Sequence, residues 1–473
     1  VYTVYRGRWA RVVPAPGEVL AAALWLSLIT LLALLSKENG LLLLWALVVV
    51  ELCFYQGVWG GRSSEALQRV TAVALCLPLL LIAGVFLLSP EWIQGLYDQR
   101  PFTLEQRLQT QGRVLWQYIG WMLTPLGPGA GLHHDDFAIS GGWLQPATTV
   151  LAAVAWLACL VVALVLPRRW PMFAFCVLFY LVTQSMESSF LPLEMVYEHR
   201  AYLPATGLAL GMAYLLHRLC SRFAPAWFAP LSLVLCLALG LSSLVRASAW
   251  ADELMLATVN LQAHPESVRS VYHHANASLR YASRVEQDEQ RQALLHAAVE
   301  SYRRMHQMSP DNFTAPASLT YIAGRYQVGG HTQGYWFARL REAADRRVLQ
   351  AEDLNALSML VSCQLADICT LPAERMDELL AVVYARTRQR HYVDELRGRL
   401  LAARPGMEQQ AAAAYRRAID AAPGYAPAYY GLASLLNREQ LGGEAVEVLR
   451  RLSARDGRRL QLAPLAYSLD FEL

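Results

Sequence analysis

The sequence predicts an all-α protein in which a multi-span transmembrane helical bundle is followed by a C-terminal α-solenoid. The chain of 473 residues divides near residue 250 into an apolar half and a charged half rich in alanine, leucine and arginine. Long apolar runs recur through the first half, and the period of packed helices runs through the second. We therefore expect two domains, at residues 1–249 and 250–473.

Apolar runs of about 16 to 19 residues mark the first domain, and a helix needs about this length to cross roughly 30 Å of hydrocarbon. Burial inside a soluble protein is the alternative interpretation. It fails because seven such runs in one half leave too little polar surface to cover them. The sequence predicts about seven spans, at 18–36, 40–55, 70–88, 148–166, 171–186, 201–217 and 228–246.

The positions of the arginines orient these spans. Arginines precede the first run and lie in three of the connecting loops, so those segments are predicted to be cytoplasmic. The opposite side then receives the loop region 89–147 and everything after residue 247. Every basic residue but one is arginine, which is typical of a GC-rich bacterial genome. The predicted location is a bacterial inner membrane, crossed several times, with the second domain in the periplasm.

Two of the eight cysteines, Cys363 and Cys369, lie in the second domain. The topology places this domain in an oxidising compartment, so the pair is predicted to form a local disulfide. The other six cysteines fall in or beside the apolar runs and are interpreted as small packing residues. Structural zinc is not expected, because no second Cys/His pair stands at ligand spacing.

Repeated pairs of helices organise the second domain. Large and small residues alternate at helical spacing through 428–436 and 444–449, which is typical of a tetratricopeptide-like α-solenoid, and an earlier copy begins at 271–277. The concave face of such a solenoid commonly holds a peptide or protein, and Tyr429 and Tyr430 are the aromatic residues predicted to lie there. A spacer or an oligomerisation arm is the alternative role. Nothing in the repeats resembles a catalytic constellation.

Ionisable groups interrupt the apolar half at positions where burial in a membrane is costly. Lys37, the only lysine, lies beside Glu38 in a short break between two runs, and simple snorkelling of Lys37 to water is the alternative. Directly before another run come three consecutive charged or titratable residues, Glu198-His199-Arg200. Two further acids, Glu187 and Glu194, stand on the same loop. An anchor for topology does not require three acids, so we expect a functional site.

A third polar cluster, His133-His134-Asp135-Asp136, lies in a stretch rich in glycine and proline. Two imidazoles and two carboxylates suit a divalent metal, but adjacent residues cannot all point at one ion. An ordinary polar turn is the equal alternative. The preceding segment 113–121 is too short to span and rich in tryptophan and tyrosine, so it is predicted to be an interfacial or re-entrant helix.

Cations and carboxylates at the outer mouth of a helical bundle suit a phosphate-bearing lipid. A guanidinium holds two phosphate oxygens at once, and a carboxylate can take a proton from an incoming hydroxyl. Arg200 and Lys37 are the groups expected to stabilise the charge that develops on a lipid phosphate leaving group. Membrane lipid is thus an expected partner, and nucleic acid is not.

Taken together, these features resemble the transmembrane and tetratricopeptide repeat-containing O-mannosyltransferases and their bacterial relatives. The resemblance rests on many apolar spans, the Lys-Glu pair within 34–40, a Glu-x-Arg-x-Tyr-Leu-Pro phrase at 198–204 and C-terminal repeats. It covers nearly the whole chain, and its specificity lies in the order of the parts. The resemblance implies a GT-C-like fold that takes a sugar from a polyprenyl phosphate and passes it to a protein hydroxyl.

The resemblance also implies roles for particular residues. Lys37, Glu38, Glu198 and Arg200, with His199 between the last two, line the lipid-phosphate pocket in this interpretation. The repeats present the acceptor, a periplasmic protein or peptide, with Tyr429 and Tyr430 as its expected contacts.

The general base is the main departure from the family pattern. GT-C enzymes carry an acidic motif in the first non-cytoplasmic loop, which is expected upstream of Val1. The flank Tyr5-Arg6-Gly7-Arg8 is typical of a segment that follows a membrane span, so we expect a fragment lacking N-terminal membrane segments. Within the chain itself, Asp135 and Asp136 are the candidates for this base.

The sequence therefore predicts a membrane glycosyltransferase-like protein with a polyprenyl-phosphate-linked sugar as donor substrate. Two alternatives stay open. One is a non-enzymatic, membrane-anchored repeat scaffold for envelope assembly, in which the polar clusters serve as structural glue. The other is a polymerase or ligase of lipid-linked glycans, which shares the donor but has a saccharide acceptor.

Overall fold

The computed structural model describes residues 2–98, 100–124, 131–349 and 351–455, and it is mostly helical, with 76% helix and 2% strand. The chain forms two compact units, Val1–Ser267 and Val268–Leu473. The boundary lies beyond residue 249 because η5 (Ala249–Ala251) packs on both α10 (Phe228–Ser248) and α11 (Glu253–Ala263), which keeps these elements in the first unit.

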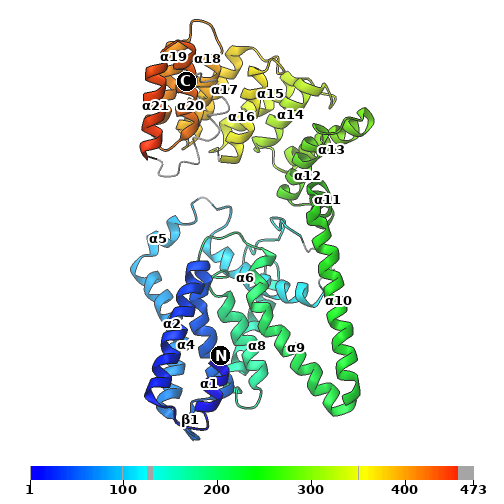
Figure 1. Cartoon of the computed structure of the whole chain (residues 1–473). Helices are drawn as coiled ribbons and strands as arrows, with labels where there is room; N and C mark the ends of the chain where they lie inside the picture. Colours follow the sequence, from blue (N-terminus) through cyan, green and yellow to red (C-terminus); the bar gives the residue numbers. More distant parts are fainter. Residues whose placement is uncertain (1, 99, 125–130, 350, 456–473) are drawn as a thin grey trace. The chain divides into compact units, whose positions relative to one another are not determined.

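The first unit is a bundle of helices with one small hairpin (Figure 1). Before α10, its elements are α1 (Tyr2–Trp9), α2 (Pro16–Ser36), η1 (Glu38–Leu42), α3 (Leu43–Val50), η2 (Glu51–Tyr55), β1 (Val58–Trp59), β2 (Arg62–Ser63), α4 (Glu65–Leu88), α5 (Pro90–Gly95), α6 (Leu104–Leu123), α7 (Thr148–Val165), α8 (Pro171–Gln184), η3 (Glu198–Ala201), α9 (Tyr202–Phe223) and η4 (Pro225–Trp227).

Four helical stretches of the described chain are long and apolar enough to cross a membrane, rather than the seven that the sequence predicted. They are Pro16–Ser36, Glu38–Tyr55, Thr148–Val165 and Pro225–Ala251. Of the other three runs, 171–186 forms α8, whose 14 residues are too few to cross roughly 30 Å at 1.5 Å per residue. The run 201–217 lies in α9, whose last turn is polar. The run 70–88 lies in α4, and some side chains of α4 are outside the residues that the structure describes.

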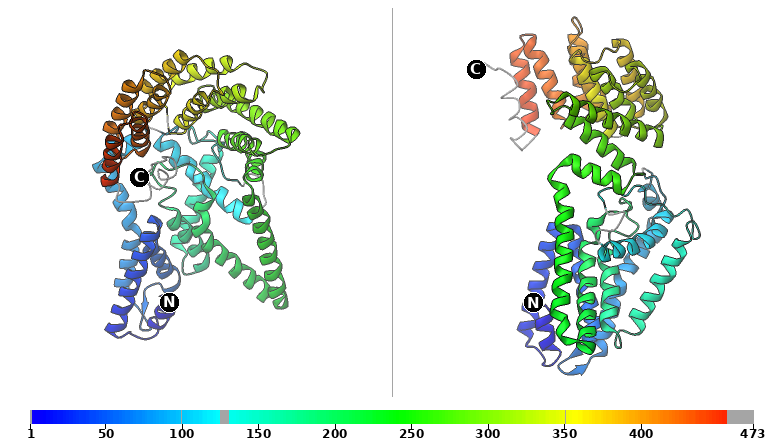
Figure 2. Two further views of the ribbon diagram at one scale, coloured as in Figure 1. Left: turned by 45° about the horizontal axis from the view of Figure 1, so that its top comes forward. Right: turned by 90° about the vertical axis from the view of Figure 1, so that its right-hand side faces the viewer.

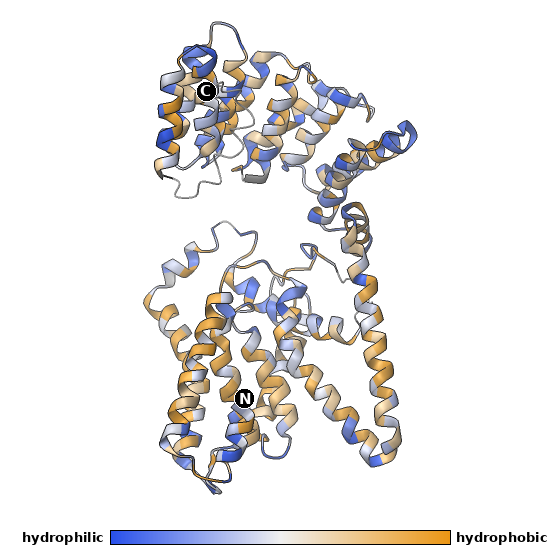
Figure 3. Ribbon diagram, viewed as in Figure 1, coloured by the Kyte–Doolittle hydropathy of each residue, from blue (hydrophilic) through white to orange (hydrophobic). Residues whose placement is uncertain are grey.

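The candidate spans expose much of their apolar surface. Leu35, Leu151 and Leu237 are 75%, 65% and 63% exposed, and apolar residues cover these helices on several sides (Figure 3). A contiguous apolar surface of this kind is unusual on a soluble protein and is what a lipid environment accommodates.

Two apolar clusters hold the first unit together. The first cluster joins α3, η2, α7 and α8 through Val49, Cys53, Ala163, Phe175 and Leu178. A second cluster packs α6 against the segment that connects α8 to η3. Its buried members are Tyr97, Phe102, Val114, Tyr118, Trp121, Met195 and Val196. This second cluster fixes the loop that carries the polar residues of interest.

The second unit is a curved row of helices, most of which pack against the next helix along the chain (Figure 2). Its helices are α12 (Val268–Ala282), α13 (Asp288–Met308), α14 (Thr314–Tyr326), α15 (Gln333–Arg346), α16 (Ala351–Leu365), α17 (Ala373–Arg386), α18 (Arg390–Ala402), α19 (Glu408–Ala421), α20 (Ala426–Arg438) and α21 (Gly442–Arg455). Helices α14, α16, α18 and α20 also contact one another in sequence, so these alternate helices of the row stack.

Small residues let neighbouring helices of this row approach closely. The buried ring of Tyr415 on α19 lies against Gly398 on α18 and Gly431 on α20, where an added Cβ would come within 2.7 and 2.3 Å of the ring. Cys363 and Cys369 form a disulfide at the end of α16, with their Cα atoms 5.2 Å apart.

Candidate functional site

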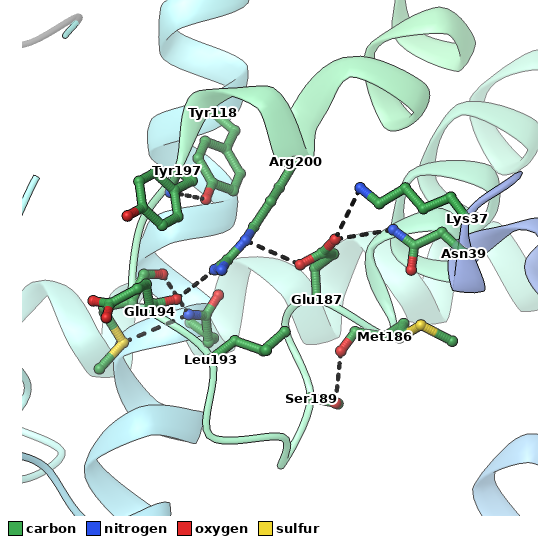
Figure 4. Close-up of polar contacts among 12 residues, drawn as sticks. Lys37, Asn39, Tyr118, Met186, Glu187, Ser189, Leu193, Glu194, Tyr197 and Arg200 are labelled. Atoms are coloured by element: carbon green, nitrogen blue, oxygen red, sulfur yellow. Dashed lines mark hydrogen bonds and ion pairs between the residues drawn. The ribbon is translucent and has the colours of Figure 1, made fainter. Parts of the chain in front are cut away.

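Lys37 and Arg200, which are far apart in the sequence, meet on one carboxylate, that of Glu187 (Figure 4). Arg200 Nε lies 2.9 Å from Glu187 Oε2, and Lys37 Nζ lies 3.5 Å from Oε1. Asn39 Nδ2 donates a hydrogen bond of 2.9 Å to the same Oε1. We call Lys37, Asn39, Glu187 and Arg200 the Glu187 site.

The turn between α2 and η1 brings Lys37 and Asn39 to this carboxylate. Lys37 leaves the helix with extended backbone (φ −156°), and Gly40 N donates to Lys37 O at 2.8 Å. Gly40 lies so close to the last turns of α2 that an added Cβ would fall 2.2 Å from the carbonyl carbon of Ala33. The tight reversal therefore requires glycine, and it leaves Glu38 exposed to solvent.

A buried arginine on α6 shapes the loop that carries Glu187. Arg107 is fully buried and donates to the carbonyl oxygens of Glu187, Ser189 and Leu193 at 2.7, 2.9 and 2.5 Å. Burial lowers the pKa of Arg107 to about 10, which leaves the guanidinium charged at neutral pH. Gln111 on the same helix adds a bond of 2.7 Å to Met195 O. Side chains on one face of α6 thus donate the hydrogen bonds that the carbonyl oxygens of this loop do not receive from regular secondary structure.

Arg200 is held more firmly than Lys37. Its guanidinium also donates to Glu194 O and lies 5.1 Å from the centre of the Tyr197 ring, and its side chain is only 8% exposed. The Lys37 side chain is half exposed. Tyr197 N in turn donates to Tyr118 Oη at 3.0 Å, and Arg100 pairs with Glu194 at 3.0 Å. The site therefore combines a fixed guanidinium with an accessible ammonium.

His199 lies beside this site with its ring 5.2 Å from that of Tyr197. Partial burial, followed by the charges of Arg200 and Lys37, lowers the pKa of His199 below its usual value. The imidazole is therefore neutral at pH 7 and adds no charge to the Glu187 site.

Glu198 belongs to a different cluster, although the sequence grouped it with Arg200. Its Oε1 accepts a hydrogen bond of 2.6 Å from Gly131 N, and its Oε2 pairs with Arg246 on α10. His134 Nε2 lies 3.8 Å from Oε1. Burial, and next the neighbouring His264, lower the pKa of His134 to about 4, so this ring is neutral at pH 7.

Asp135 and Asp136, the candidate bases, are engaged by the segment that follows α11. Ser267 Oγ donates to Asp135, and His264 Nδ1 lies 2.9 Å from Asp136 Oδ2. His134 meets His264 edge to face at 4.5 Å. Within the described residues, no group of three or more His, Cys, Asp or Glu side chains is arranged to hold a metal ion. The divalent metal that His133 to Asp136 suggested thus finds no ready site in this part of the chain.

In the second unit, Tyr429 is a core residue. It is 2% exposed, and its hydroxyl donates to Pro423 O at 2.9 Å, so it has no surface to offer a bound peptide. Tyr430 is half-buried. Of the two expected acceptor contacts, only Tyr430 reaches the surface.

Several residues of these clusters received no role in the sequence analysis. Glu187 stood out only as one of three acids on its loop, although it lies at the centre of the site. Asn39, Arg107, Arg246 and His264 carried no signal that separated them from ordinary turn, helix or surface residues. Their roles depend on contacts between distant segments, which one sequence does not reveal.

No protein-family model and no curated protein matches this chain. Function is therefore inferred from the chemistry of the described residues.

Proposed function

We propose that this chain binds the phosphate of a polyprenyl-phosphate-linked sugar at the Glu187 site and transfers the sugar to a protein hydroxyl, as GT-C-like glycosyltransferases do. The observation that carries the proposal is the convergence of Lys37 and Arg200, from separate elements, at the end of a candidate span. Paired cations at membrane depth are costly, so their convergence favours a functional anion site.

The chemistry of the site suits a lipid phosphate. The planar guanidinium of Arg200 matches two phosphate oxygens, and Lys37 offers a more mobile ammonium that reaches solvent. Both cations would stabilise the negative charge that grows on the phosphate as the bond to the sugar breaks. The apolar surface of α2, directly before Lys37, suits the prenyl chain of the donor.

We place the chain in a bacterial inner membrane, with the Glu187 site and residues 268–473 on the periplasmic side. The arginines of the α1 region and of the α4 and α9 termini support this orientation. The disulfide in the second unit supports an oxidising compartment. In this proposal the paired helices of the second unit form a tetratricopeptide-like solenoid that presents a protein acceptor.

The acceptor hydroxyl also needs a base. Asp135 and Asp136 can serve only if they leave Ser267 and His264, their partners in this structure.

Sugar transfer in membranes tests the proposal. Membranes that contain the wild type or Arg200→Ala receive a radiolabelled sugar on a short polyprenyl phosphate, together with periplasmic protein. We expect Arg200→Ala to lose at least about a hundredfold in transfer, because a charge-assisted contact made in the transition state is lost. Arg222→Ala, an exposed arginine on α9, is the matched control and should keep transfer. Equal transfer by both variants, at equal protein levels, would refute the role of the site.

A scaffold without enzymatic activity is the second candidate, and one observation favours it. Arg200 and Glu187 are both less than 10% exposed and already pair with each other, as structural glue would. A scaffold predicts that Arg200→Ala destabilises the fold while a prenyl phosphate neither binds nor stabilises the wild type. Thermal unfolding with and without prenyl phosphate separates the two candidates.

A further inference from the structure

We infer that Glu187 makes the site selective for a phosphate with one negative charge over a phosphate with two. This inference rests on the proposed function and assigns a specificity-determining role to a residue inside the cation cluster. In chemical terms, the site prefers a phosphodiester, such as a prenyl-phosphate-linked sugar, to a phosphomonoester, such as the prenyl phosphate left after transfer.

The charge balance of the site leads to this inference. Lys37 and Arg200 contribute two positive charges, and Glu187 cancels one of them. Arg107 adds a positive charge behind the loop, and the exposed Glu38 adds a negative charge beside Lys37. Arg100 and Glu194 pair with each other, and His199 is neutral at pH 7. The surroundings therefore carry a net charge near +1, which matches a monoanion.

The position of Glu187 is fixed by the loop. Arg107 holds its carbonyl oxygen at 2.7 Å, and three side-chain donors hold its carboxylate, which is 9% exposed. The carboxylate charge thus stays in the site instead of swinging into solvent.

A phosphate can still reach Lys37 without displacing Glu187. Lys37 Nζ carries three N–H donors and makes one carboxylate contact, at 3.5 Å, while half of its side chain is exposed. An anion that docks at the exposed side of Lys37 would feel the negative charge of Glu187 a few ångströms away.

The ionisation of phosphate esters turns this geometry into selectivity. A phosphomonoester has a second pKa near 6, so it carries about −1.5 to −2 charge at pH 7, and a phosphodiester carries −1. The extra charge of the monoester is repelled by Glu187, because at close range and a dielectric constant near 20 such repulsion is substantial. Under the proposed reaction the donor is a diester and the leaving lipid is a monoester. Glu187 would therefore favour binding of donor and release of product.

Two small probes test the inference on the purified chain. Farnesyl phosphate is the monoester probe, and methyl farnesyl phosphate is the diester probe. We expect the wild type to bind the diester more tightly at pH 7.5 and low salt. Glu187→Gln should shift the ratio of the two dissociation constants about tenfold or more toward the monoester. Glu65→Gln removes an exposed carboxylate on α4 that pairs with Arg69 and lies outside this charge balance, and it should leave the ratio unchanged.

Measuring the two dissociation constants of the wild type as a function of pH tests the same selectivity without a substitution. At pH 5 the monoester is a monoanion, so its disadvantage should disappear. His199 is the imidazole beside the site, and its protonation would strengthen binding of both probes alike. This measurement keeps the inference falsifiable if Glu187→Gln does not fold.

The outcomes separate the inference from the proposed function. If the wild type binds both probes and the ratio changes neither in Glu187→Gln nor at pH 5, the inference is overturned and the phosphate site stands. If the wild type binds neither probe, the proposed function fails, and the inference falls with it.

Discussion

Arg107 offers the sharpest structural prediction, because one side chain holds the loop that carries the Glu187 site. Arg107→Ala removes three donors and leaves the carbonyl oxygens of Glu187, Ser189 and Leu193 without these partners. A buried polar group that loses its partner costs about 1 to 3 kcal/mol. The substitution also removes the free-energy cost of burying a charged guanidinium, which offsets part of this loss of stability. We expect the free energy of unfolding of the first unit to fall by about 3 to 5 kcal/mol.

Unfolding in mixed micelles, together with limited chymotrypsin digestion, measures this effect. Phe190 and Leu193 lie in the loop, so its loosening should expose new cleavage sites, which mass spectrometry would locate. Arg113→Ala is the matched control on the same helix. Arg113 is only partly buried and donates to one carbonyl oxygen, that of Ala138 at 2.7 Å, so its loss should cost about 1 kcal/mol. If Arg107→Ala unfolds like Arg113→Ala and the loop resists digestion, Arg107 does not hold this loop.

Two further predictions concern close packing and pH. Gly431→Ala would place a Cβ 2.3 Å from the Tyr415 ring, so the second unit should lose about 1 to 3 kcal/mol in denaturant unfolding. Gly443→Ala meets no atom within 4 Å and should unfold like the wild type; equal midpoints for both variants would contradict the packing. His134 has a pKa of about 4 when folded and an ordinary value near 6.5 when unfolded, so the unfolded state binds more protons between these values. The stability contributed by neutral His134 is therefore present above pH 6.5 and is lost as pH falls toward 4, by up to about 1.4 kcal/mol per pH unit. His134→Gln should flatten this part of the plot of unfolding free energy against pH, whereas the exposed His217→Gln should not. An unchanged slope in His134→Gln would show that His134 does not titrate in this way.

The sequence predicted the helical character of the chain, and it predicted seven spans where the described residues contain four candidates. Apolar runs report hydrophobicity but not where a helix begins or ends. The run 171–186 loses its last residues to turns, and α9 carries His217, Arg218 and Arg222 in its final turns. Length thus separates α8, and polarity in the final turns separates α9, from the four candidate spans.

The polar site was harder to predict because neighbours in sequence diverge in space. Glu198 and Arg200 lie in η3, a 3₁₀ turn, where successive residues point about 120° apart. Arg200 therefore faces Glu187, and Glu198 faces Gly131 and Arg246. The sequence suggested Lys37 and Arg200 as one group, but it could not choose the carboxylate between them.

Photo-crosslinking tests directly whether a lipid phosphate binds beside Lys37 and Arg200. A farnesyl phosphate with a diazirine on its first isoprene unit is irradiated with the purified chain, and the labelled peptides are mapped by mass spectrometry. A lipid-phosphate site at these residues predicts that labels fall within 34–40 and 185–200, that excess methyl farnesyl phosphate competes with them, and that Arg200→Ala loses them. Labels spread over the candidate spans without competition, or equal labelling of Arg200→Ala, would contradict it.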